Sequence, residues 1–135
     1  MKFLLDTNIV CEPLAKKPDA GCVSWLESQA QGMLVTTTIT LAEVWQGVLN
    51  LDDTDKRRPL LMRFSESLPK VFRMVGFDER AAKSWGEITR RGLSPLPVRD
   101  SLIAAIALSR RLTVVTRDQR PFKQAGCRTV NPFTG

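Results

Sequence analysis

The chain has 135 residues, of which 43% are hydrophobic and 25% charged, as is typical of a folded globular protein. Twenty basic residues against fourteen acidic ones give a net charge of +6, which favours a polyanionic partner, either nucleic acid or an acidic protein. The longest apolar run, 102–108, is too short to cross a bilayer, and Asp6 interrupts the N-terminal apolar run before a signal peptide can form. A cytoplasmic, non-membrane protein is therefore expected.

The absence of histidine excludes several kinds of catalytic site. A Ser-His-Asp triad, a histidine-activated cysteine and a histidine-ligated zinc ion all require this residue. Cys11, Cys22 and Cys127 are an odd number without close spacing, so neither a disulfide framework nor a Cys-x-x-Cys metal site is indicated. We interpret them as small buried side chains, and acid–base chemistry must come from carboxylates, lysine or metal-bound water.

In chain order, a short apolar run at 2–5 is typical of a buried strand, and a helix at 19–31 and a β-branched strand at 33–37 follow it. The clearest helix spans 40–51, because its apolar residues recur at the i, i+3, i+4, i+7, i+8 spacing of one buried face. These residues are Leu41, Val44, Trp45, Val48 and Leu49. A more basic helix is predicted at 55–68.

The second half of the chain continues the alternation. A strand at 71–77 precedes a helix at 78–91 and a breaker segment at 92–97. A strongly apolar helix at 99–111 is followed by strands at 112–115 and 128–130. The pattern predicts an α/β fold, a three-layer α/β/α sandwich with a central, mostly parallel sheet, in which ligands bind at the carboxyl ends of the strands. Because no repeat or linker interrupts it, residues 1–135 are expected to form a single domain.

Four acids, far apart in sequence, occupy element ends, and each also has a purely structural explanation. Asp6 follows the first strand and can cap the next helix, whereas Asp118 follows strand 112–115 and can cap a turn. Glu43 can form a capping box with Thr40. Asp100 lies in the first turn of helix 99–111, where the helix dipole favours an acid.

Taken together, the same four acids can converge on one rim of the sheet. Such a cluster would repel itself unless a divalent cation neutralised it. Oxygen ligands without histidine or cysteine suit Mg²⁺ or Mn²⁺ and not zinc. The rest of the chain holds ten acids against twenty basic residues. A metal site that acts on phosphodiesters requires such a cluster of acids within an otherwise basic protein.

Four segments of the sequence resemble those of PIN domains. Residues 4–8 read Leu-Leu-Asp-Thr-Asn, 40–43 Thr-Leu-Ala-Glu, 100–105 Asp-Ser-Leu-Ile-Ala-Ala and 116–118 Thr-Arg-Asp, in this order. The C-terminal segment 126–133 is similar to the tail of the VapC/FitB branch of that family. The resemblance covers essentially the whole chain.

This resemblance implies an Mg²⁺- or Mn²⁺-dependent endoribonuclease, and in the bacterial branch a homodimeric toxin held inactive by a cognate antitoxin. Residues at the catalytic and metal-binding positions of the family are Asp6, Glu43, Asp100 and Asp118. Residues at its supporting polar positions are Thr7, Asn8 and Thr116. Arg99 and Arg117 adjoin two of the acids, and each can contact an RNA phosphate or pair with an acid.

One position departs from the family pattern. Many members of the branch have Asn where Asp118 stands and an Asp three residues later, but here that later position is Pro121. Asp118 is therefore predicted to be the fourth acid. Pro121 also motivates an alternative, a nucleic-acid- or antitoxin-binding module with weakened catalysis. A phosphoacceptor regulatory domain is disfavoured, because the adjacent acidic pair and the lysine that it requires are not found where expected.

Other prominent residues receive structural interpretations. Trp25, Trp45 and Trp85 fall on apolar helical faces, so we interpret them as core packing in preference to base stacking. The run 56–58, Lys-Arg-Arg, is interpreted as a solvated helix face in preference to an RNA-binding patch.

Overall fold

The computed structural model describes residues 2–91 and 96–134. Its sheet has five parallel strands in the order β3-β2-β1-β4-β5, which confirms the predicted parallel sheet. The strands are β1 (Phe3–Leu5), β2 (Leu34–Thr37), β3 (Arg73–Val75), β4 (Thr113–Val115) and β5 (Thr129–Val130). Strand β3 is shorter than the predicted 71–77: it begins later because the preceding helix continues as far as Val71, and it ends at Val75.

Seven α-helices lie within the described ranges. They are α1 (Thr7–Cys11), α2 (Ala20–Ser28), α3 (Thr38–Leu49), α4 (Arg58–Val71), α5 (Glu79–Arg90), α6 (Val98–Arg110) and α7 (Arg120–Gln124). Short 3₁₀ turns span Glu12–Leu14 and Gln31–Met33. Of the predicted breaker segment 92–97, residues 92–95 lie outside the described part of the chain.

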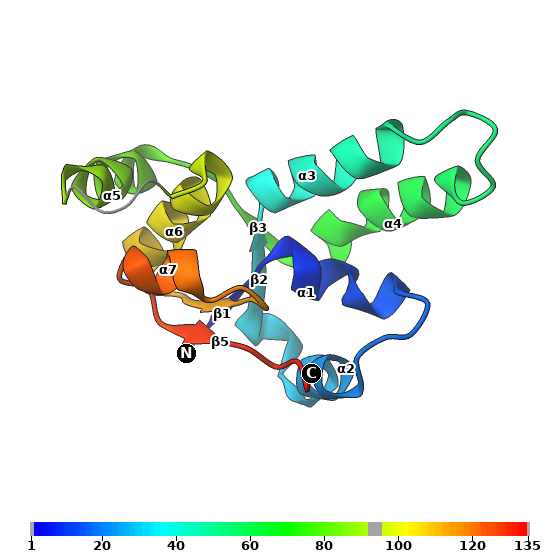
Figure 1. Ribbon diagram of the computed structural model, residues 1–135, viewed down its shortest axis with the longest axis horizontal. Coiled ribbons are helices and arrows are strands. Elements are labelled where there is room, and N and C mark those ends of the chain that lie inside the picture. Colours follow the sequence, from blue (N-terminus) through cyan, green and yellow to red (C-terminus); the bar gives the residue numbers. More distant parts are fainter. Residues whose placement is uncertain (1, 92–95, 135) are drawn as a thin grey trace.

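Helices cover both faces of the sheet, so the molecule is a three-layer α/β/α sandwich (Figure 1). Helices α5, α6 and α7 pack on one face, and α1 to α4 pack on the other. The neighbouring residues Leu4 and Leu5 of β1 are both fully buried, but they contribute to different cores because side chains alternate across a strand. Leu4 lies in the core that contains Ile103 of α6, and Leu5 lies in the core that contains Val44 of α3.

Helix α3 begins two residues before the predicted start at Thr40. Thr37 is its N-cap, with extended backbone angles (φ −111°, ψ 156°), and its hydroxyl oxygen accepts the backbone N–H of Thr40 at 2.9 Å. The predicted capping box between Thr40 and Glu43 is therefore wrong, because β2 runs directly into α3 and Thr37 is the residue at the junction. Glu43 is released from helix capping and is available to the site.

The far ends of α3 and α4 extend beyond the sheet (Figure 1). Val44 and Val48 of α3 are buried as predicted, but Leu49 is 51% exposed because no strand lies beneath the last turn of this helix. Trp25 packs edge-on against Phe3 at 5.0 Å between ring centroids, in line with its interpretation as core packing.

The topology places a switch point at the centre of the sheet. Strand β1 lies between β2 and β4, so the chain leaves β1 toward one edge of the sheet and later returns on the other side. The carboxyl ends of β1 and β4 are neighbours, and such a switch point is where α/β sheets bind ligands. Among the described helices, none is long and apolar enough to span a membrane.

Candidate functional site

Asp6 lies at the end of β1 and is also the N-cap of α1. The backbone N–H of Thr7 donates to its Oδ1 at 2.8 Å, and the Thr116 hydroxyl donates to its Oδ2 at 2.9 Å. Burial raises the pKa of this carboxyl group; the two hydrogen bonds lower it, and the charge of Glu43 raises it further. Asp6 is therefore a buried acid held in one orientation beside a second acid.

Asn8 and Thr116 connect the ends of β1 and β4. The Asn8 amide nitrogen lies 3.4 Å from Thr116 Oγ1 and 3.5 Å from Asp6 Oδ2, and its Oδ1 accepts the backbone N–H of Arg117 at 3.1 Å. Thr116 Oγ1 also accepts the backbone N–H of Asp118 at 3.2 Å. The polar residues predicted to support the site thus hold the loop that carries Asp118 against Asp6.

Glu43 reaches the site from the second turn of α3. Its Oε1 accepts a short hydrogen bond from the Thr7 hydroxyl, and its Oε2 lies 2.5 Å from Nη1 of Arg99. The Glu43 side chain is 23% exposed and that of Arg99 is 52% exposed. Arg99 was expected either to contact an RNA phosphate or to pair with an acid, and the structure shows it paired with Glu43.

Asp100 and Asp118 complete the set of acids. Asp100 is half-buried in the first turn of α6, as predicted, and Asp118 is exposed in the loop after β4. Burial is the main cause that raises the pKa of Asp100; the charges of Asp6, Asp118 and Glu43 raise it further, and the charge of Arg99 lowers it. The structure therefore brings the four predicted acids close enough to act on one another electrostatically.

The chemistry of these residues fits a divalent cation. In the described ranges, no group of three or more acidic or cysteine side chains forms a ready metal cage. However, the acids raise the pKa of Asp100 through their negative charges, and a bound cation would relieve that repulsion. All of the donors are carboxylate oxygens, which suit a hard ion such as Mg²⁺ or Mn²⁺.

Pro121, at the position where the resemblance leads one to expect an acid, lies in the first turn of α7 and is buried. A proline is well accommodated there, because the first N–H groups of a helix have no partner within the helix. Asp118, three residues earlier, is the acid that this loop presents near Asp100. Its role as the fourth member of the site stays a prediction.

Two features of the site were not predicted from the sequence. The first is Thr37, the N-cap of the helix that carries Glu43. Several neighbouring threonines could have capped this helix, so the sequence alone did not identify Thr37 as the cap. The guanidinium of Arg117 lies 4.7 Å from the centroid of the Phe133 ring, a cation–π contact between the site loop and the C-terminal tail. This pairing joins residues 16 positions apart and has no local sequence signal.

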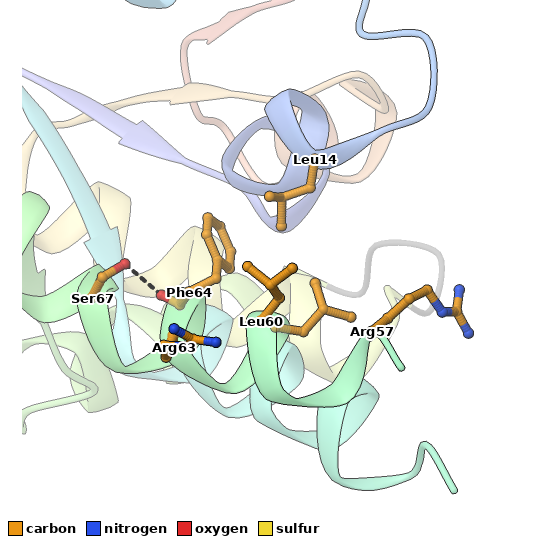
Figure 2. Close-up of a pocket in the computed structure, with 7 residues that line it drawn as sticks. Leu14, Arg57, Leu60, Arg63, Phe64 and Ser67 are labelled. Carbon is orange, nitrogen blue, oxygen red and sulfur yellow. Dashed lines mark hydrogen bonds between the residues drawn. The ribbon is translucent and has the colours of Figure 1, made fainter. Parts of the chain in front are cut away.

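An apolar groove runs from the site along α4. Near the site it is lined by Thr7, Glu43 and Cys11, and farther out by Leu14, Leu61 and Phe64. These last three residues also line the next section, a cavity of about 600 Å³ whose wall contains Leu60, Arg57 and Arg63. Figure 2 shows Leu14 pointing toward Leu60 and Phe64 across this section. The two sections form one continuous surface that begins at Thr7 and Glu43.

Comparisons with known proteins agree with this fold. The PIN domain matches residues 3–126. The plasmid stability protein StbB of Pseudomonas syringae pv. tomato is 35% identical over 97% of this chain and 98% of its own. The VapC ribonuclease Y4jK of Sinorhizobium fredii is 31% identical over 97% of each chain.

The toxin FitB of Neisseria gonorrhoeae is 34% identical over 97% of this chain and 98% of its own. The crystal structure of FitAcB from the same organism superposes with a TM-score of 0.87, at 34% identity, over 96% of this chain and 97% of that chain. The chain therefore belongs to the PIN domain family, in the branch that contains FitB and VapC.

Proposed function

We propose that this protein is a divalent-metal-dependent endoribonuclease and the toxin of a toxin–antitoxin pair. The observation that carries the proposal is the mutual electrostatic effect of Asp6, Glu43, Asp100 and Asp118 where β1 and β4 end. Membership of the PIN domain family and a relative named a ribonuclease support the same activity. A relative named a toxin supports the biological role.

These four acids would hold Mg²⁺ or Mn²⁺, which when bound supplies positive charge to the scissile phosphate and lowers the pKa of a water molecule. The protein keeps the acids oriented for this task. Thr116 and the backbone of Thr7 fix the Asp6 carboxylate, and the Thr7 hydroxyl fixes that of Glu43. Arg99 and Arg117 offer positive charge to RNA phosphates at the rim of the site.

The test is cleavage of a labelled, structured RNA by purified protein with Mg²⁺, with Mn²⁺ and with EDTA. We expect cleavage with either metal, none in EDTA, and a loss of more than about a hundredfold in Asp6→Asn, since changes in supporting residues alone cost 10–100-fold. Asp52→Asn, at an exposed acid in the loop after α3, is the matched control and should cleave normally.

Cleavage that survives EDTA or Asp6→Asn would overturn the metal–carboxylate mechanism. RNA binding without cleavage under either metal would favour the alternative that Pro121 motivates, a binding module with weakened catalysis.

The partner implied by this function is an antitoxin protein, and the protein itself is proposed to form a homodimer. The groove that starts at Thr7 and Glu43 is the surface we assign to the antitoxin, because an occupant there would cover Glu43 as well as the apolar wall. The positive charge of Arg63 at its outer section favours an apolar segment with acidic flanks.

A further inference from the structure

Arg99 connects two of the acidic elements of the site. It precedes Asp100 in the first turn of α6, and its guanidinium reaches Glu43 on α3. At 2.5 Å between Nη1 and Oε2, the contact is a close ion pair. An arginine from the helix that carries one acid therefore neutralises an acid of another helix.

Each carboxylate oxygen of Glu43 has one close partner. Oε1 accepts the Thr7 hydroxyl, and Oε2 faces the guanidinium. A hydroxyl group is neutral and can stay beside a metal ion, but two cations on the same carboxylate oxygen repel each other. A divalent ion that binds Oε2 of Glu43 therefore competes with Arg99 for that oxygen.

The charge of Arg99 also reaches the other acids. It favours the ionised forms of both Asp6 and Asp100, against the effect of the neighbouring carboxylates. Arg117, also at the rim, instead lies over the Phe133 ring. Arg99 is thus placed to supply positive charge to the cluster without a metal.

We propose that Arg99 is an internal counter-ion of the acidic cluster, which competes with the divalent metal for Glu43 and leaves this carboxylate when the metal binds. Its side chain is 52% exposed, so it has room to turn outward. The released guanidinium is then at the rim of the site, where it can contact an RNA phosphate. This inference rests on the proposed function in one respect, the binding of a divalent metal by these acids.

The experiment measures Mn²⁺ affinity by calorimetry for the wild-type protein, Arg99→Gln and Arg128→Gln. Arg128 immediately precedes β5 and so lies at the opposite end of the parallel sheet, where the same loss of charge should change affinity less than about twofold. We expect Arg99→Gln to bind Mn²⁺ about three- to tenfold more tightly, because the substitution removes a positive charge beside Glu43, a proposed ligand of the metal.

A second measurement separates competition from misfolding. In EDTA, Arg99→Gln should melt at a lower temperature than wild type, since the repulsion among the acids is no longer offset. Saturating Mn²⁺ should raise its melting temperature more than that of wild type. Arg99→Lys, which keeps the charge but not the planar fork, should lie between the two in both measurements.

An Mn²⁺ affinity of Arg99→Gln equal to or weaker than that of wild type, while wild type binds Mn²⁺, overturns the role of Arg99 and leaves the proposed nuclease intact. Wild-type protein that binds no Mn²⁺ overturns both. Tighter binding by Arg99→Gln together with unchanged binding by Arg128→Gln supports competition at Glu43.

Discussion

At the scale of single residues, the site depends on groups that are not themselves acids. Thr116 is fully buried, and its hydroxyl both donates to Asp6 and accepts from the backbone of Asp118. One oxygen atom therefore sets the orientation of one acid and the position of the loop that carries another. Supporting groups of this kind commonly change metal affinity or activity as strongly as some ligands do.

Thr116→Val tests this role. Valine keeps the shape of threonine but removes the hydroxyl, so Asp6 loses a hydrogen bond and the Asp118 N–H loses its acceptor. We expect metal-dependent RNA cleavage to fall about 10–100-fold. The free energy of unfolding, measured by urea denaturation, should fall by about 1–2 kcal/mol.

Thr36→Val is the matched control for the loss of a buried hydroxyl. Thr36 is also fully buried, and its hydroxyl donates to the Leu5 carbonyl at 2.9 Å without touching an acid. Its stability should fall by a similar amount, with cleavage near the wild-type rate. Equal losses of activity in the two variants would show that Thr116 acts through the fold and not through Asp6.

At the scale of elements, the C-terminal tail is held against α2. Asp19 caps α2 through the backbone N–H of Cys22 at 2.9 Å, and it also accepts the hydroxyl of Thr134 at 2.6 Å and its N–H at 3.1 Å. One carboxylate therefore joins the start of a helix to the end of the chain. The same tail carries Phe133, which supports Arg117 at the rim of the site.

Gly21 shows how closely the tail approaches. A Cβ atom at this position would lie 2.2 Å from Cγ2 of Thr134 and 2.8 Å from the Pro132 carbonyl oxygen, which is backbone and cannot turn away. In an open helix, Gly→Ala normally stabilises by about 1 kcal/mol. Here we expect the opposite sign, a loss of stability of about 1–3 kcal/mol from overpacking, measured by urea denaturation.

Gly86→Ala in α5 gives the comparison, because a Cβ there meets no atom within 4 Å. This variant should gain about 0.5–1 kcal/mol. If Gly21→Ala were also stabilising, the tail would not be packed against α2 as described.

The elements that sequence predicted well are those with a long or strongly apolar pattern. Helix α6 is an example, since Ile103 to Ala107 are all fully buried and the helix begins one residue from the predicted start. Helices α1 and α7 have five residues each, too few to show a helical period, and were not predicted. The start of α3 was misplaced, because any of several threonines could cap it and only the end of β2 selects Thr37.

At the scale of the whole molecule, the position of the acids could be predicted but not their contacts. Parallel strands bring Asp6 and Asp118 to one edge of the sheet, and this follows from topology alone. The pairing of Arg99 with Glu43 depends on how α6 and α3 face each other across that edge. The groove likewise depends on the packing of α4 beside the turn that carries Leu14, which no local pattern specifies.

The last prediction concerns the groove and tests whether inhibition by the antitoxin can be lost without loss of RNA cleavage. Leu60 is 67% exposed on α4 and lines the outer section of the groove, away from the acids. Leu60→Glu should leave RNA cleavage within about twofold of wild type, since exposed positions rarely affect the fold. It should weaken, by about 10–100-fold, the inhibition by an antitoxin that neutralises the wild-type protein. The reason is that it replaces an apolar contact with a negative charge, which would also repel the acidic flanks proposed for the antitoxin segment.

The measurement is the antitoxin concentration that halves RNA cleavage. Val71→Glu is the control: Val71 is 46% exposed at the end of the same helix and does not line the groove, so the same charge there should leave inhibition unchanged. Equal inhibition of both variants would place the antitoxin on another surface. Weaker inhibition of Leu60→Glu alone would show that the antitoxin binds the apolar wall of the groove as well as the acids.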